Sequence, residues 1–167
     1  MAGPDRRAYA WRRLDLQGTT VVAVEGRSDE IVVRSVETCA EDGRIWAATA
    51  TTLLDGRWSH LRTDVTVVDG DGLRELVVDD LAGCDVLDLA GNPFTNAFVL
   101  RRPDVADEVE VLAAYVETPS LEVRPLHQRY RRVDADRWEY ADETGAFVMV
   151  VDRDGVVVDY EGLAIRL

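Results

Sequence analysis

Several residue types that mark particular classes of protein are missing from this chain or rare in it. Lysine is absent, so all 19 basic residues are arginine, and 32 acidic residues outnumber them. The net charge of −13 would repel phosphate backbones and the anionic inner face of a membrane, which argues against a nucleic-acid partner. Arginine favours forked pairing with carboxylates, although codon bias explains the absence of lysine equally well.

Cysteines and long apolar runs are also scarce. Cys39 and Cys84 are too few for the disulfide framework of a small secreted protein, and we predict that both are buried free thiols. The residues after Met1 include no apolar stretch typical of a signal peptide, and no later run reaches the length that spans a bilayer. We therefore expect a cytoplasmic protein with no membrane-spanning segment.

Residues that commonly carry catalysis or bind metals are equally sparse. His60 and His127 are the only histidines, and Ser120 precedes His127 without the sequence of a nucleophile elbow. The stretch from Asp152 to Gly155 lacks the further ligands of a calcium loop, and no glycine-rich phosphate loop is present. We predict no catalytic site, no metal and no cofactor. An enzyme that uses a pair of Asp or Glu side chains remains a third alternative, which no motif specifically supports.

The residues that are present predict a β protein. The 167 residues, 47% of them hydrophobic and 31% charged, fit one domain spanning residues 1–167. Between Leu61 and Val68 apolar and polar residues alternate, so every second residue, beginning with Leu61, shares the buried face of a strand. Similar segments occur at residues 19–25, 30–38, 45–53, 73–78, 138–140, 147–151 and 156–160.

Turn residues separate these segments at regular intervals. Gly and Asp cluster at residues 26–29, 41–43, 55–56, 69–72 and 152–155, where they suit tight hairpins. We predict an antiparallel meander with no long crossover connection. So many strands would leave a flat sheet with one face uncovered, so we expect the sheet to curl around something that fills its concave side.

Two segments have helical features. Asn92 and Pro93 suit the start of a helix, and residues 93–100 are apolar on nearly all sides, as expected for a short helix enclosed by the sheet. Residues 104–117 fit a helix that begins near Asp104, but their alternation fits a strand over residues 109–117 equally well. The pattern alone does not decide whether this second segment is a helix or a strand.

Polar residues in and after the first of these segments are candidates for binding. Thr95 and Asn96 would need hydrogen-bonding partners inside the sheet, supplied either by the protein or by a ligand. Arg101 and Arg102 could pair in forked fashion with Asp85 or Asp88 on the preceding strand, or recognise an anionic head group. We favour pairing within the protein in both cases.

Basic and aromatic residues elsewhere could likewise serve either in ligand binding or in contacts within the protein. Residues 128–132 form the only concentrated basic patch, in which Arg129 and Arg131 share one face of a strand and would pair with carboxylates of neighbouring strands or bind an anion. The four tryptophans could stack on a sugar ring, although core packing is the more common role. These are Trp11, Trp46, Trp58 and Trp138.

The segment from Gly83 to Leu89, followed by residues 92–96 and Arg101-Arg102, resembles the signature of a bacterial family described as glycolipid-binding and formerly as a domain of unknown function. Further landmarks agree in order across the chain: Trp11, Trp58, Thr63, residues 119–121, residues 128–130, Asp152, residues 155–157, Asp159-Tyr160 and Gly162-Leu163. The resemblance implies a spiral β-roll, a half-closed barrel of many strands wrapped around one α-helix and often found as a homodimer. It also favours a strand over residues 109–117.

The sequence departs from the family pattern at two places. Residues 97–100 lack the proline that the family usually carries before the two arginines, and Glu161 replaces a common proline. The first change favours a continuous helix, in which the bulky Phe98 could narrow a cavity.

Our first functional hypothesis is a non-enzymatic protein that binds a glycolipid or another lipid-like, amphipathic ligand in an apolar cavity between the curled sheet and the helix. The alternative is a dimeric structural or interaction module with a packed core and no small ligand. For the first hypothesis we predict ligand contacts from Thr95, Asn96, Arg101, Arg102, Arg129, Tyr130 and Trp58.

Overall fold

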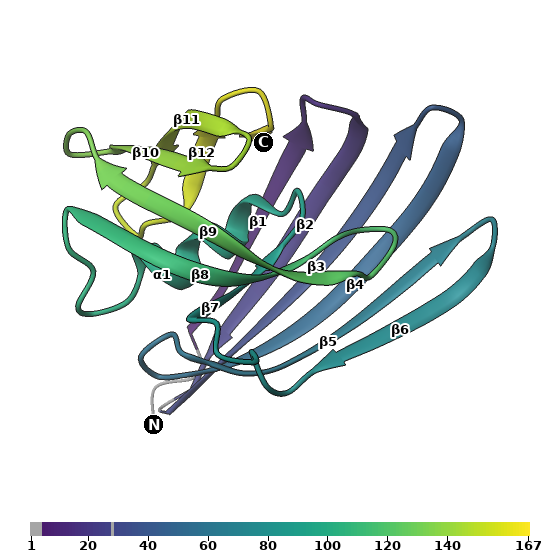
Figure 1. Cartoon of the computed structure of the whole chain (residues 1–167), viewed down its shortest axis with the longest axis horizontal. Helices are drawn as coiled ribbons and strands as arrows, with labels where there is room; N and C mark the ends of the chain where they lie inside the picture. The colour runs from purple at the N-terminus through teal and green to yellow at the C-terminus, as the bar shows by residue number, and fades with distance from the viewer. Residues whose placement is uncertain (1–4, 28) are drawn as a thin grey trace.

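The computed structural model describes residues 5–27 and 29–167. Thirteen strands of this part of the chain form one sheet, in the order β6-β5-β4-β3-β2-β1-β13-β12-β11-β10-β9-β8-β7 (Figure 1). Their bounds are β1 (Asp5–Arg13), β2 (Gln17–Gly26), β3 (Glu30–Glu41), β4 (Arg44–Asp55), β5 (His60–Asp69), β6 (Gly72–Val78), β7 (Val86–Leu89), β8 (Glu108–Val116), β9 (Val123–Arg132), β10 (Arg137–Asp142), β11 (Gly145–Val151), β12 (Val157–Tyr160) and β13 (Ala164–Arg166).

Two antiparallel meanders make up most of the sheet. Successive strands from β1 to β6 pair with one another, and so do successive strands from β8 to β13. The meanders are joined where β1 pairs with β13, with Trp11 opposite Arg166. The prediction of a mainly β protein with a largely antiparallel sheet and one short helical segment is confirmed. The strand that the resemblance favoured over residues 109–117 is also confirmed, since this segment forms most of strand β8.

The prediction of a meander with no long crossover is wrong at one place. Strand β7 does not pair with β6; it lies at the far edge of the sheet and runs parallel to β8. Because parallel neighbours cannot be joined by a tight hairpin, residues 90–107 must cross over between them, and these residues contain the helix. The regular turn signals of the sequence predict hairpins only, so they could not predict the crossover from β7 to β8.

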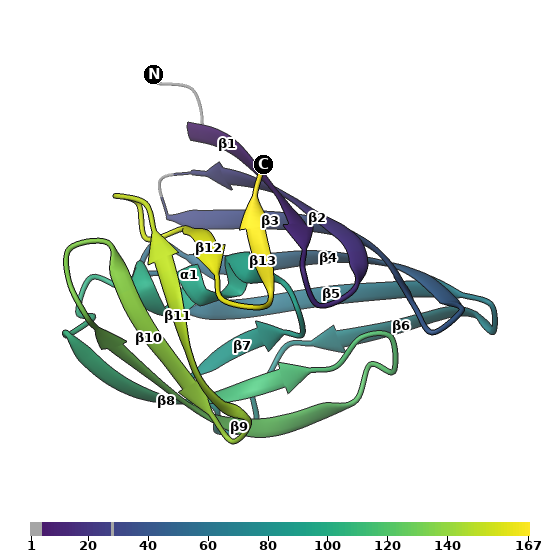
Figure 2. The same cartoon turned by 90° about the horizontal axis from the view of Figure 1, so that it is seen from above.

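The helical segment begins as the 3₁₀-helix η1 (Pro93–Asn96) and continues as α1 (Ala97–Leu100). The Asn92 side chain caps it by accepting a hydrogen bond of 3.1 Å from the Phe94 backbone N–H, as the Asn-Pro sequence predicts. Every residue of η1 and α1 is buried. Seen from above, the helix lies between the long strands β2–β5 and strands β8–β11 (Figure 2).

The main hydrophobic core surrounds this helix. Phe94 and Phe98 belong to one buried cluster with Trp11 of β1, Val65 of β5 and Val116 of β8, so both meanders contribute to it. As predicted, all four tryptophans are buried. The helix thus supplies the apolar filling that the inner face of the sheet requires.

Two predictions about individual residues are wrong. Leu61 was expected on the buried face of its strand, but it is 46% exposed. The register shifts there, because Leu54 pairs with His60 and Leu53 pairs with Arg62, which leaves Leu61 as the extra residue of a bulge. Cys84 is a free thiol but is only partly buried, since it lies in the loop before β7 rather than in a strand. Cys39 is free and buried as predicted.

Candidate ligand-binding site

A pocket of about 250 Å³ lies beside the start of the helical segment, against strands β7, β8, β10, β11 and β12. The residues that give it its chemical character are carboxylates and aromatic rings. These are Asp88, Asp142 and Glu161, and Tyr115, Tyr140, Phe147 and Tyr160. We call this cavity the acidic aromatic pocket.

The turn before the helix forms one wall of this pocket through Gly91, Asn92 and Asn96. Gly91 has a φ of +73°, and a Cβ atom there would collide with the guanidinium of Arg13, so this turn requires glycine. Arg13 itself is held by a forked pair of bonds to Asp15, of 2.8 and 2.6 Å. The close approach of Arg13 therefore fixes the turn without leaving an uncommitted charge.

Asp88 connects the helix to the sheet beneath the pocket. One of its carboxylate oxygens accepts a 2.6 Å hydrogen bond from the Thr95 hydroxyl, and the other accepts a 2.6 Å bond from the Gln128 amide. Burial raises the pKa of Asp88 to about 6, although both hydrogen bonds act in the opposite direction. Part of the side chain still borders the pocket, so a ligand could reach it.

Tyr130 extends the same hydrogen-bond network. Its hydroxyl lies 3.1 Å from Oδ1 of Asn96 and 3.2 Å from Oε1 of Gln128, and the Asn96 amide donates to the Pro93 carbonyl at 3.1 Å. The Thr95 hydroxyl also lies 2.9 Å from the Asn92 carbonyl oxygen, so that carbonyl and Asp88 share its single proton. Protein groups therefore satisfy Thr95 and Asn96, as we favoured from the sequence, and the network holds the helix in one position.

The aromatic wall is built from strands that are neighbours in the sheet. Tyr140 lies with its ring centre 5.3 Å from that of Tyr130 and 5.8 Å from that of Tyr160, and Phe147 lies 6.2 Å from Tyr160. Burial, reinforced by the charge of Asp88, raises the pKa of Tyr115 to about 12 and raises the pKa values of Tyr140 and Tyr160 further. These tyrosines are therefore neutral near pH 7 and present both rings and hydroxyl groups.

The other two carboxylates are held by uncharged donors. Asp142 accepts hydrogen bonds from the Tyr140 hydroxyl at 2.8 Å and from the backbone N–H and hydroxyl of Thr144 at 2.7 and 2.6 Å. Glu161 accepts a 2.9 Å bond from the Val148 backbone N–H. Within residues 5–27 and 29–167, neither these carboxylates nor Asp88 form an ion pair, and none of the residues that line the pocket is basic.

Of the residues predicted to contact a ligand, Asn96 lines the pocket, and Thr95 and Tyr130 stand one hydrogen bond behind it. Trp58 and Arg101 pack on each other elsewhere, with the guanidinium carbon 4.3 Å from the ring centre. The remaining two, Arg102 and Arg129, also lie away from this pocket.

The expected forked pairing of Arg101 or Arg102 with Asp85 or Asp88 is wrong. Arg101 stacks on Trp58, and Arg102 donates to the backbone carbonyl of Asp85 at 2.5 Å. The Asp85 carboxylate accepts a bond from the Leu112 N–H of β8 instead. Pairing of the basic patch with neighbouring carboxylates is confirmed, since Arg129 and Arg131 lie 3.4 and 3.0 Å from Glu139.

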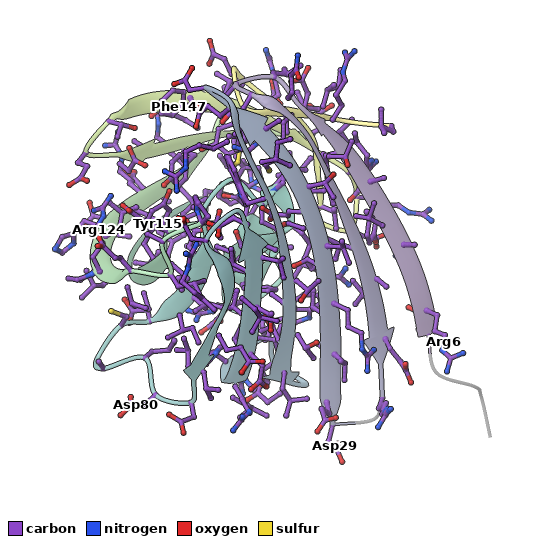
Figure 3. The ribbon with its side chains drawn as sticks, turned by 90° about the vertical axis from the view of Figure 1, so that its right-hand side faces the viewer. Arg6, Asp29, Asp80, Tyr115, Arg124 and Phe147 are labelled. Carbon is purple, nitrogen blue, oxygen red and sulfur yellow. The ribbon has the colours of Figure 1, made fainter. Side chains whose placement is uncertain are left out.

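The aromatic wall and two acids of the pocket, Asp142 and Glu161, were not predicted from the sequence. Tyr140 and Asp142 lie two residues apart on β10, so alternation places both on one face of that strand. Figure 3 shows Tyr115 next to Arg124, on the same side of the molecule as Phe147. Alternation along β10 could have shown that Asp142 lies on the same face as Tyr140. It could not have shown that residues of other strands meet them in one pocket, because that depends on how the strands pair.

Residues with catalytic potential do not converge. The His60 ring lies 3.1 Å from the Thr63 hydroxyl on β5, while His127 is exposed on β9. The Ser120 hydroxyl accepts a bond from the Glu122 N–H. Across the described residues, no group of three or more His, Cys, Asp or Glu side chains is arranged to hold a metal ion. The chemistry of the acidic aromatic pocket therefore rests on carboxylate acceptors, hydroxyl groups and rings.

Comparisons with known proteins agree with this architecture. The model of a family described as "Putative glycolipid-binding" matches residues 8–166. A crystal structure of a DUF1089 family protein from Pseudomonas aeruginosa superposes with a TM-score of 0.74 at 28% sequence identity, covering 89% of this chain and 92% of that one. No curated protein matches the sequence. In the described part of the chain, no helix has both the length and the apolar character needed to cross a membrane.

Proposed function

Because this chain belongs to the family described as "Putative glycolipid-binding", we propose that it is a non-enzymatic protein that binds the sugar part of a glycolipid-like, amphipathic ligand in the acidic aromatic pocket. The observation that carries this proposal is the combination, in one cavity, of aromatic rings with carboxylate, amide and hydroxyl groups. Rings stack on the apolar faces of sugars, and carboxylates accept hydrogen bonds from sugar hydroxyls.

The size of the pocket selects the part of the ligand that enters it. At about 250 Å³ it is somewhat smaller than the roughly 300–1,000 Å³ typical of pockets for drug-sized molecules, so a head group of about one ring fits better than a whole lipid. Its lining is also more polar than the apolar cavity expected from the sequence. We therefore place the head group inside the pocket and the apolar part of the ligand outside it.

Asp88 is a preorganised acceptor at the edge of the pocket. Each of its oxygens accepts one hydrogen bond from a protein group, which fixes the orientation of the carboxylate and leaves lone pairs for a ligand. The side chains of Asp142 and Thr144 are likewise hydrogen-bonded to each other. Such committed groups suit a preformed site that recognises a ligand without changing it.

Truncating the aromatic wall is expected to weaken sugar binding. Hexyl β-glucoside, kept below its micelle concentration, should bind the wild-type protein saturably in isothermal titration calorimetry. Phe147→Ala should raise its Kd about 10-fold, because stacking and burial of one ring are lost, and a factor of 10 corresponds to about 1.4 kcal/mol. The matched control is Val148→Ala, the next residue on β11, whose side chain is exposed. Absence of saturable binding to the wild type, or equal affinities for both variants, would contradict the proposal.

We also propose that the protein forms a homodimer through the outer face of its long strands. Exposed Val21 on β2 lies opposite exposed Val36 on β3, and Val36 lies opposite Thr49 on β4. Two residues further along the same face, exposed Val68 on β5 lies opposite exposed Leu73 on β6, and these side chains together form an uncharged strip. Two copies that each carry a charge of −13 would approach with least repulsion through such a strip.

Sedimentation velocity should therefore detect a dimer of the wild-type protein that salt strengthens, because salt screens the repulsion between the two copies. Val36→Glu should shift the population to monomer by placing like charges in the strip. Val148→Glu, on the other meander, should have no such effect. A wild-type protein that stays monomeric at high concentration would overturn this proposal. If the protein dimerises but binds no glucoside, the alternative of a structural module gains support.

A further inference from the structure

Among the described residues, three carboxylates gather at the acidic aromatic pocket without an arginine partner. Some carboxylates elsewhere on the chain do have one: Asp152 lies 2.6 Å from Arg166, and Asp69 lies 2.6 Å from Arg74. In contrast, the carboxylates of Asp88, Asp142 and Glu161 accept hydrogen bonds only from amide and hydroxyl groups in the described part of the chain. Three anionic groups therefore border one small cavity with no protein cation to balance them.

The basic residues close to this pocket are already engaged. Arg13, which packs against Gly91, is held by Asp15 through two hydrogen bonds. Arg124 stacks on Tyr115 with its guanidinium carbon 5.1 Å from the ring centre, and it pairs with Glu143 at 2.8 Å. Neither arginine lines the pocket. An anionic head group would meet like charges there, and a neutral one would leave the charge of the site unbalanced.

The aromatic rings of the pocket point to the same kind of ligand. Tyr115, Tyr140, Phe147 and Tyr160 line one cavity, and ring faces attract a cation within about 6 Å through their negative quadrupole. Tyrosine is neutral near pH 7, and burial raises the pKa of these three above the ordinary value, so the rings carry no charge of their own. Carboxylates together with several rings make a cage suited to an ammonium group. The net charge of −13 would in addition raise the local concentration of cations.

We propose that the head group bound in the acidic aromatic pocket carries a protonated amine, as an amino sugar does, and that Asp142 and Glu161 recognise that amine. This inference rests on the proposed sugar-binding function and narrows its substrate class. The amine would donate hydrogen bonds to the carboxylates while the sugar ring lies against the aromatic wall. A phosphorylated or carboxylated head group is excluded by the same charges.

The test compares three matched ligands near pH 7 and at low salt: hexyl 2-amino-2-deoxy-β-glucoside, hexyl β-glucoside and the N-acetylated form of the amine. The wild-type protein should bind the amine at least about 10-fold more tightly than the other two, and added salt should reduce this ratio. Acetylation removes the charge but keeps the ring, so it separates charge from shape. Equal affinities for the amine and the glucoside would overturn the inference and leave the proposed function standing.

Substitutions of the two carboxylates test whether they cause the preference for the amine over the glucoside. Asp142→Asn keeps an oxygen that can accept the Tyr140 bond, and the ratio of amine to glucoside affinity should fall toward one. Glu161→Gln provides the same test through a different turn of the chain if the first variant is unstable. Asp159→Asn is the matched control, because Asp159 is exposed on β12 one residue before Tyr160. A preference that survives both pocket substitutions would overturn the assignment, and a wild type that binds none of the three ligands would overturn the proposed function as well.

Discussion

Replacing Phe94 with alanine is expected to lower the free energy of unfolding by about 3–5 kcal/mol, a large part of the roughly 5–15 kcal/mol that holds a typical domain together. The Phe94 side chain is 1% exposed at the start of the helical segment. Its ring centre lies 5.6 Å from that of Tyr9, 6.4 Å from those of Trp11 and Trp58, and 6.1 Å from that of Phe98. Alanine would leave a cavity that four rigid rings cannot easily fill.

The loss should be measured by urea unfolding with the slope of the transition compared between variants. Phe147→Ala is the matched control, because it removes the same atoms from a ring that is only partly buried and packs mainly on Tyr160. We expect that control to be at least about 1–2 kcal/mol less destabilising. If both substitutions cost the same, the aromatic cluster around the helix does not dominate the core.

The helix and the hairpins were predictable because their signals are local. Asn92 and Pro93 specify the start of a helix within two residues, and the Asp and Gly clusters specify turns between adjacent strands. Strand β1 was missed because its first residues are exposed and rich in charge, and β13 was missed because it has only three residues. Alternation cannot be recognised over so short a span.

The crossover and the binding pocket depended on contacts between distant parts of the chain. Asp88 on β7 lies beside Tyr115 because these two strands pair in parallel, and no turn signal records that pairing. Tyr140 and Tyr160 reach the same pocket through the registers of β10, β11 and β12. The sequence could show that such residues point inward, but it could not show that they face one cavity. The family resemblance predicted the fold, whereas the chemistry of the pocket is visible only in the folded structure.

Glu37 is the source of the second large effect, which depends on pH. Its side chain is 3% exposed on the inner face of β3, opposite Thr20 and Ala48 on the neighbouring strands, and Oε2 has no hydrogen-bond partner among the described residues. Burial raises the pKa of Glu37 from 4.5 to about 7, although the positive charge of Arg13 acts in the opposite direction. The folded protein thus holds this proton more tightly than the unfolded chain does.

The sign of the effect follows from proton linkage. Below pH 4.5 the carboxyl is protonated in both states and the fold bears no penalty. As the pH rises from 4.5 toward 7 the unfolded chain releases the proton first, so stability falls, and above pH 7 the full cost is present. A difference of roughly 2.5 pKa units corresponds to about 3 kcal/mol.

The glutamine of Glu37→Gln cannot ionise, so the free energy of unfolding of this variant should not fall in the same way as the pH rises. Urea unfolding of the wild type and the variant near pH 4.5 and near pH 8 should give a change in their difference of about 3 kcal/mol, with the variant gaining at the higher pH. Glu41→Gln, at the exposed end of the same strand, controls for removal of one negative charge from a highly acidic protein and should gain far less. Parallel pH profiles for the wild type and Glu37→Gln would show that Glu37 does not carry the penalty. A buried acid of this kind is then expected to make the protein most stable in mildly acidic solution, where Glu37 stays protonated and the surface ion pairs still form.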